Sequence, residues 1–413
     1  MDPDFVAYRT RQPADTARER ARLWRVQLLM AAAVACGSIG AVWLAATMGA
    51  GAAGAAAVIV AGLLPVALAT PLAAWVAGRV ARRTLLWSAP ATLAAALVAC
   101  DLSAEALGVG SVIACAMLMG VARVAFDGVT ADVLHQLVDD ARRPDATRDL
   151  TARFGAGSAL GLAGALGAGL LLRGPEGAIL FAGGLALAAA VVAARHHPDL
   201  DLRMSGRPPL TAAVRAALRV VAGDAVLRRV LVAGAWSTGV GAAQAAVLIV
   251  WLKDGVGLRG ALVPALMAGF AAVRLSRPLV RRLAARSRPG SVLVMALGVQ
   301  AAASLTAYAL RGAVGAAAAY ALSLAAGVFL GVLVNRALRI AAPAPLAPAV
   351  GLAAGAVWAL AACAGAAAGG LLATGVGLAG THLVLAAVAL TASAALAVRA
   401  AAAGATLRPR RAR

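Results

Sequence analysis

The chain has 413 residues, of which 62% are hydrophobic, and its 38 Lys and Arg against 17 Asp and Glu give a formal net charge of +21. This apolar share exceeds the roughly 45–50% of soluble domains, and the apolar runs reach the ~20 residues that cross a bilayer, which excludes a soluble globular protein. The basic excess does not indicate nucleic-acid binding, because the arginines stand at the ends of apolar runs, where they set topology and meet anionic headgroups.

Twelve apolar runs follow one another along the chain and predict an all-α integral membrane protein with twelve transmembrane helices. They cover residues 26–48, 54–77, 84–102, 108–134, 154–173, 177–194, 230–252, 258–277, 290–310, 313–335, 347–373 and 377–398. Residues 1–25 form a leader that is too long and too acidic for a secretory signal, so we interpret it as retained. Residues 401–413 form a basic tail.

Basic residues gather in every second gap between the runs. Only Arg173, Lys253, Arg259 and Arg311 fall in the opposite gaps, and Arg123 falls within a run. By the positive-inside rule, the basic face is cytoplasmic. We therefore expect a multi-pass protein of the plasma or inner membrane with both termini in the cytoplasm.

The longest polar stretch, residues 195–229, divides the runs into six and six and predicts two bundles, 26–194 and 230–400. Within this linker Leu210, Val214, Leu218 and Val221 recur at helical spacing. An amphipathic helix on the cytoplasmic membrane surface and a flexible basic linker both fit this pattern.

The two halves resemble each other in sequence. Similar residues open spans one and seven, follow spans two and eight, and lie within spans five and eleven. The corresponding pairs Arg25 and Arg229, Arg79 and Arg282, and Gly164 and Gly365 are 201 to 204 residues apart. A repeated offset of this kind predicts two parallel six-helix repeats with pseudo-symmetry, as in transporters that alternate access around a midplane site.

The loop after span two, residues 74–83, resembles the signature of the major facilitator superfamily at the same place. That signature runs Gly, three residues, Asp-Arg and then basic residues, but here Ala74 replaces the Gly and Gly78 replaces the Asp. The resemblance implies loops that gate the cytoplasmic side, and the loss of the Asp weakens the family's latch. The residues assigned to gating are Gly78, Arg79, Arg82, Arg83, Arg282 and Arg286.

Glycine strings in spans five and eleven resemble the Gly-Pro-x-x-Gly-Gly element of the same family, with Ala165 and Ala366 in place of proline. Its helix-five copy is associated with antiporters, although close packing of helices explains small residues equally well. The glycines concerned are Gly164, Gly169, Gly365, Gly369 and Gly370. Residues 120–127 and the loop 139–153 resemble the drug-exporter-like branch.

Arg123 and Asp127 are ionisable residues one turn apart in span four. Charges inside a span are costly and therefore candidates for function, and i,i+4 pairing reduces that cost. We predict Asp127 as the proton acceptor, with Arg123 adjusting its proton affinity or meeting an anionic substrate group. The alternative is a pair at the helix end with no role in transport.

Span seven carries an aromatic ring and neutral polar groups in a helix that the resemblance places at the central cavity. The predicted cavity residues are Trp236, Ser237, Thr238 and Gln244, with Asn335 at the end of span ten. Such groups suit a largely apolar substrate. Trp236 equally fits an interfacial anchor, and Gln300 and His382 fit hydrogen bonding between helices.

No cofactor, catalytic residue or metal site is predicted. The four cysteines lie in spans without CxxC spacing, no Walker lysine motif occurs, and HExxH and GxSxG are absent, so neither ATP hydrolysis nor another enzyme activity is indicated. We predict a monomeric secondary transporter that exports a small organic molecule in exchange for protons, in contact with anionic lipid headgroups. An uncoupled facilitative transporter and a degenerate, non-transporting receptor or scaffold are the alternatives.

Overall fold

The computed structural model describes most of the predicted spans as helices. It covers residues 13–68, 81–137, 143–172, 174–195, 210–251, 253, 289–310, 314–315, 318–319, 321–323, 325–326 and 347–402. Within these ranges the regular structure is helical throughout, with no strand. The predicted span 258–277 and most of 313–335 lie outside the described residues.

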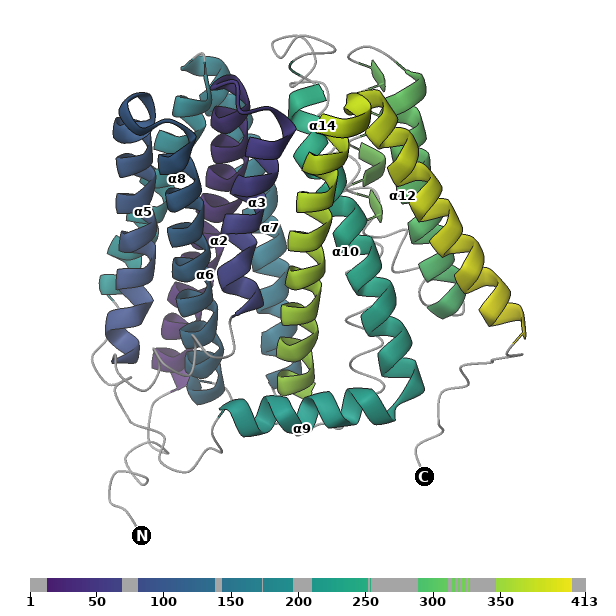
Figure 1. Ribbon diagram of the computed structural model, residues 1–413. Coiled ribbons are helices and arrows are strands. Elements are labelled where there is room, and N and C mark those ends of the chain that lie inside the picture. Colours follow the sequence, from purple (N-terminus) through teal and green to yellow (C-terminus); the bar gives the residue numbers. More distant parts are fainter. Residues whose placement is uncertain are drawn as a thin grey trace, which may run out of the picture. The chain divides into compact units, whose positions relative to one another are not determined.

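The helices follow the order of the apolar runs (Figure 1). They are α2 (Pro13–Thr47), α3 (Gly51–Ala67), α5 (Arg82–Leu107), α6 (Val109–Leu137), α7 (Arg143–Leu171), α8 (Pro175–Ala194), α9 (Leu210–Gly223), α10 (Ala225–Trp251), α12 (Pro289–Ala309) and α14 (Ala347–Ala402). Among the described residues, six helical segments are long and apolar enough to cross a membrane, and Gly51–Ala67 and Val294–Ala309 are shorter apolar helices. The predicted all-α membrane class is confirmed.

Glycines mark several of the helix boundaries. Gly108, with φ of 62°, separates α5 from α6, and Gly377, with φ of 73°, breaks α14 between the two predicted spans 347–373 and 377–398. Only glycine adopts such positive φ angles without strain, so the chain turns where these residues stand. Gly174 in extended conformation precedes Pro175 at the first position of α8, which is the favoured place for proline in a helix.

The chain folds into two compact units. Unit 1 contains Met1–Gly40, Leu72–Ser103 and Val121–Arg207, and unit 2 contains Ala41–Pro71, Ala104–Gly120 and Pro208–Arg413. The core of unit 1 includes side chains with at most 1% exposure from α2, α5, α6 and α8. These are Leu23, Val26, Leu86, Leu93, Leu97, Phe126 and Ile179.

In unit 1, α7 packs closely on α2 through glycine. A Cβ added at Gly157 would collide with the backbone at Leu28, and one added at Gly161 would collide with Ala32. Small residues four positions apart allow two helix backbones to approach in this way. α7 also packs against α8, where Gly177 lies against the α7 backbone at Ala168.

In unit 2, α14 packs against α10, α12, α3 and α9. Gly365 of α14 lies against the backbone of Gly239 in α10, and Gly369 lies one turn further along against Ala243. The same stretch of α14 places Gly370 against residues 52–56 of α3. Both helices of the α10–α14 contact therefore carry small residues at i and i+4.

The predicted linker contains a helix, α9, which runs crosswise to α10 and α14 (Figure 1). Val221 is buried, whereas Arg215 and Arg219 are exposed. This favours the amphipathic helix over the flexible linker as the account of residues 210–223. The backbone N–H of Leu227 donates to Asp224 Oδ1 at 3.2 Å, which caps the start of α10.

Candidate functional site

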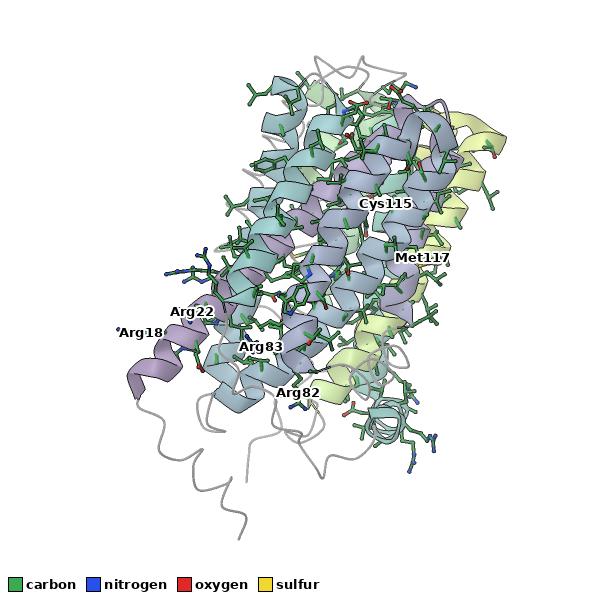
Figure 2. The ribbon with its side chains drawn as sticks, turned by 90° about the vertical axis from the view of Figure 1, so that its left-hand side faces the viewer. Arg18, Arg22, Arg82, Arg83, Cys115 and Met117 are labelled. Carbon is green, nitrogen blue, oxygen red and sulfur yellow. The ribbon has the colours of Figure 1, made fainter. Side chains whose placement is uncertain are left out.

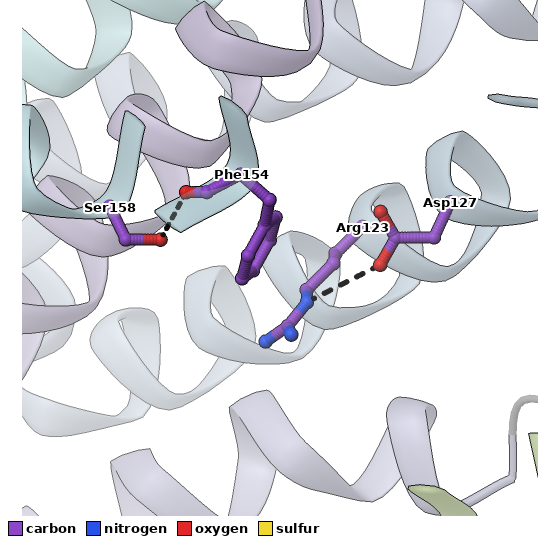
Figure 3. Close-up of polar contacts among 4 residues, drawn as sticks. All are labelled: Arg123, Asp127, Phe154 and Ser158. Carbon is purple, nitrogen blue, oxygen red and sulfur yellow. Dashed lines mark hydrogen bonds and ion pairs between the residues drawn. The ribbon is translucent and has the colours of Figure 1, made fainter. Parts of the chain in front are cut away.

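An ion pair on α6 is the centre of the candidate site. Arg123 Nε lies 3.6 Å from Asp127 Oδ2 within one helical turn, with 32% and 46% of the two side chains exposed (Figure 3). The guanidinium carbon of Arg123 also lies 5.7 Å from the centre of the Phe154 ring on α7. A cation over an aromatic face is favourable, so Arg123 has one partner on its own helix and one on the next.

α2 contributes the third side of this site through Gln27. This side chain is only 5% exposed and is a polar neighbour of the Asp127 carboxylate. Gln27 Oε1, Arg123 Nε and Thr130 Oγ1 are buried atoms without a hydrogen-bond partner among the described residues. Buried polar atoms are normally satisfied, so Gln27 Oε1 and Thr130 Oγ1 have spare capacity to bind water or a ligand, whereas Arg123 Nε already faces the Asp127 carboxylate.

Sequence reasoning identified the charged pair but missed Gln27 and Phe154. Gln27 is a polar residue within an apolar run, which is a signal of its own. Phe154 follows Arg153 at the start of span five and carries no such signal, because an aromatic residue at a span end is ordinary. Ser158 Oγ donates to the Phe154 carbonyl at 3.0 Å on the same helix (Figure 3).

Two of the predicted cavity residues in span seven make hydrogen bonds to the neighbouring helix α12. Ser237 Oγ donates to Gln300 Oε1 at 2.9 Å, and Gln300 Nε2 donates to the Ser237 carbonyl at 3.0 Å. Gln244 Nε2 donates to the Gln300 carbonyl and to Ser304 Oγ, while Ser323 Oγ donates to Gln244 Oε1 at 3.0 Å. The side-chain amides of Gln244 and Gln300 therefore each donate and accept hydrogen bonds in a buried network.

The other cavity residues of span seven differ from these. Trp236 is 45% exposed. Thr238 Oγ1 donates to the Gly234 carbonyl at 2.9 Å on its own helix and approaches the Trp358 carbonyl of α14 at 3.3 Å. Asn335 lies outside the described residues. Among the described members of this set, Trp236 and Thr238 are therefore the ones with exposed side chains.

The Gln300 network yields a stability prediction. Replacing Gln300 with Leu removes both bonds to Ser237 and leaves the Ser237 hydroxyl buried without its acceptor, so Gln300→Leu should lower the free energy of unfolding by about 1–2 kcal/mol. The measurement is unfolding of the purified protein in detergent. Thr306→Ala is the matched control on α12, because the Thr306 hydroxyl donates to the Ala302 carbonyl of its own helix and the residue is partly exposed. Equal destabilisation by both changes would contradict the prediction.

The predicted gating residues are described only in part. Arg82 and Arg83 begin α5, and with Arg18 and Arg22 of α2 they lie toward the same end of unit 1 (Figure 2). Gly78, Arg79, Arg282 and Arg286 lie outside the described residues. The described part of the gating set is therefore Arg82 and Arg83 at the start of α5.

The predicted packing glycines differ in what they contact. Gly365, Gly369 and Gly370 face the backbones or Cβ atoms of α10 and α3, whereas Gly164 faces the ring of Phe181 in α8. Gly169 is buried. The close backbone contact of α7 is made instead by Gly157 and Gly161, which sequence reasoning did not single out although their spacing is the small-xxx-small pattern.

No group of three or more His, Cys, Asp or Glu within the described ranges is arranged to hold a metal ion. All four cysteines are buried thiols. The groups available for chemistry at the candidate site are therefore a carboxyl, a guanidinium, an amide, a hydroxyl and an aromatic ring, which suit proton binding and ligand recognition.

Comparison with known proteins gives both a family and a fold. The family model described as Major Facilitator Superfamily matches residues 23–342. No curated protein sequence matches.

Several solved transporter structures share the fold of this chain. The nucleoside transporter NupG is 12% identical with a TM-score of 0.70, covering 92% of this chain and 98% of its own. A POT family transporter in complex with a thioalcohol-conjugated peptide is 12% identical with a TM-score of 0.68, covering 93% and 96%. A bacterial homologue of the human lysosomal transporter Spinster, in an inward-facing and unoccupied conformation, is 16% identical with a TM-score of 0.61, covering 95% and 96%.

Proposed function

The chain belongs to the Major Facilitator Superfamily, and from this premise we propose that it is a proton-coupled secondary transporter that exports a small organic molecule by alternating access. The proposal includes two bundles, residues 26–194 and 230–400, that move about a central site, with both termini in the cytoplasm. Transporters built from repeats place substrate and coupling ion near the middle of the membrane, between the repeats. The drug-exporter-like branch and the exchange for protons are part of this proposal.

The observation that carries the proposal is the Arg123–Asp127 pair within a helix long enough to span the membrane. A carboxylate in this setting is costly unless it has a task or a partner. When Asp127 accepts a proton, its attraction to Arg123 is lost. Proton binding therefore changes both the charge and the contacts on α6, which is the kind of local event that biases a two-state carrier.

The nature of the cargo is supported by the surfaces that remain free. Trp236 is exposed, and Phe154 is accessible in part beside Arg123. Aromatic surface with a few polar groups suits a mostly apolar organic molecule. NupG is a nucleoside transporter and the POT structure holds a peptide conjugate, so related folds serve different cargo and the fold does not specify it.

Export in exchange for protons is supported by the glycine string of span five, which resembles the element associated with antiporters. The direct test uses the purified full chain in proteoliposomes with an imposed pH difference. A ligand at ~100 times its Kd adds about 2.7 kcal/mol of stability, so a stabilisation screen across chemical classes first supplies the cargo. We expect that cargo to leave the vesicles as protons enter, recorded by a pH-sensitive dye in the lumen.

Two other outcomes would replace the proposal. Cargo flux with no accompanying pH change would make the protein an uncoupled facilitator. Binding without flux would make it a receptor or scaffold. Three departures from the family pattern favour this alternative: Gly78 replaces the usual Asp, and Ala165 and Ala366 replace the usual prolines. Restoring the acid with Gly78→Asp separates these cases, since a changed flux requires a working carrier.

A further inference from the structure

Trp24 of α2 is contacted by two arginines from two helices of unit 1. The guanidinium carbon of Arg20 lies 5.0 Å from the centre of the indole, and that of Arg153, on α7, lies 5.7 Å from it. Arg20 and Trp24 are four residues apart and share one face of α2. Two positive charges thus lie within 6 Å of the centre of one indole, at the place where α2 and α7 meet.

Two hydrogen-bond donors in this group are buried and have no acceptor among the described residues. They are Arg20 Nε and Trp24 Nε1. The two residues are partly exposed, but these two atoms are themselves buried from solvent. Buried donors are rarely left unsatisfied because the cost of removing them from water is not recovered. What is missing is an acceptor, and the two guanidinium groups favour one that carries negative charge.

The surroundings of this group are basic and lie at a helix end. Arg18 and Arg22 of α2 and Arg82 and Arg83 of α5 lie toward the same end of unit 1 (Figure 2). Among the side chains that the structure describes, two acids are near in sequence: Glu19, which is buried and has interactions of its own, and Asp149, which is exposed one turn before Arg153 on α7. They offset part of the positive charge, and the arginines still outnumber them.

We propose that Arg20, Trp24 and Arg153 form a binding site for a phosphate group. Its oxygens accept hydrogen bonds from Arg20 Nε, Trp24 Nε1 and the guanidinium of Arg153. Arginine suits phosphate because its planar group presents several donors in a fixed geometry. The phosphate comes from the headgroup of an anionic phospholipid or from a free organic phosphate, and both make the same contacts. Trp and Arg at the end of a span are typical of the headgroup level of a bilayer.

The test measures binding of two probes to the purified full chain by native mass spectrometry: phosphatidylglycerol, with phosphatidylcholine as reference, and glycerol 3-phosphate. Arg20→Gln and Arg153→Gln should each weaken phosphatidylglycerol binding by about tenfold, because a charged hydrogen-bond donor is lost. Trp24→Phe keeps an aromatic ring for the arginines but removes the Nε1 donor, so it should weaken binding several-fold. Arg25→Gln, at an exposed position of α2, removes the same charge and should have no effect.

The probes separate the two sources of phosphate. If the variants bind phosphatidylglycerol more weakly but glycerol 3-phosphate as the wild type does, the site is a lipid site. If the variants also bind glycerol 3-phosphate more weakly, the site accepts free organic phosphates. If Arg20→Gln does not fold, Arg153→Gln and Trp24→Phe still test the site from other positions. Equal binding by wild type and variants, equal loss with Arg25→Gln, or no binding of either probe to the wild type would overturn the proposal.

Discussion

Asp127→Asn is expected to abolish proton-driven transport while substrate binding and exchange persist. Asparagine has nearly the same shape and keeps an oxygen for Arg123, but it cannot take up a proton. A pH difference of one unit supplies about 1.36 kcal/mol per proton, enough for about tenfold accumulation of a solute coupled to one proton. In the variant this accumulation should fall to the level seen without a pH difference. The measurement is solute accumulation in proteoliposomes with and without the imposed gradient.

The matched control for this change is Asp149→Asn. Asp149 is an exposed carboxyl near the start of α7, so its loss removes the same charge without touching the pair on α6. We expect coupling to persist in this control. Exchange of labelled for unlabelled solute in Asp127→Asn should no longer vary with pH, since the proposed proton acceptor has been removed. Undiminished gradient-driven accumulation in Asp127→Asn would eliminate Asp127 as the coupling acid.

Gly365→Leu is expected to destabilise the protein strongly, by about 3 kcal/mol. A Cβ at this position would already collide with the backbone of Gly239, and backbone atoms cannot move aside as a flexible side chain does. Forcing extra carbons into a packed contact costs about 1–3 kcal/mol, occasionally more, and Leu adds four of them. The α10–α14 contact should therefore open or the helices shift. Unfolding of the purified protein in detergent measures the effect.

Gly355→Leu provides the control within the same helix. No atom lies within 4 Å of a Cβ built at Gly355, so this change adds the same carbons to open space and should be close to neutral. The same contrast exists in unit 1, where Gly161 faces the backbone of Ala32 and Gly167 faces nothing within 4 Å. Similar stability of Gly365→Leu and Gly355→Leu would show that the close approach of α10 and α14 is not needed for folding.

The amino-acid sequence by itself determined the class of this protein and much of its helical order. Apolar runs of about twenty residues predict helices because a bilayer offers no hydrogen bonds to the backbone, so each span must satisfy its own. The run 177–194 corresponds closely to α8, Pro175–Ala194, and the gap at 373–377 coincides with the break at Gly377. The spacing of Arg123 and Asp127 likewise predicted their pairing, because i and i+4 adjoin on any helix.

Only the tertiary structure decided which helix each polar face meets. Helical periodicity places Ser237 and Gln244 on α10, but whether they face a cavity or a neighbouring helix depends on the position of α12. Gln300 of α12 is 63 residues from Ser237 and 56 residues from Gln244 in the sequence. The same holds for Gln27 beside Asp127 and for Arg153 over Trp24, which come from different helices. Alanine and leucine are as apolar as lipid tails, so hydrophobicity selects no particular partner for a span. Close packing of small residues and a few hydrogen bonds make that choice, and both depend on three-dimensional contact.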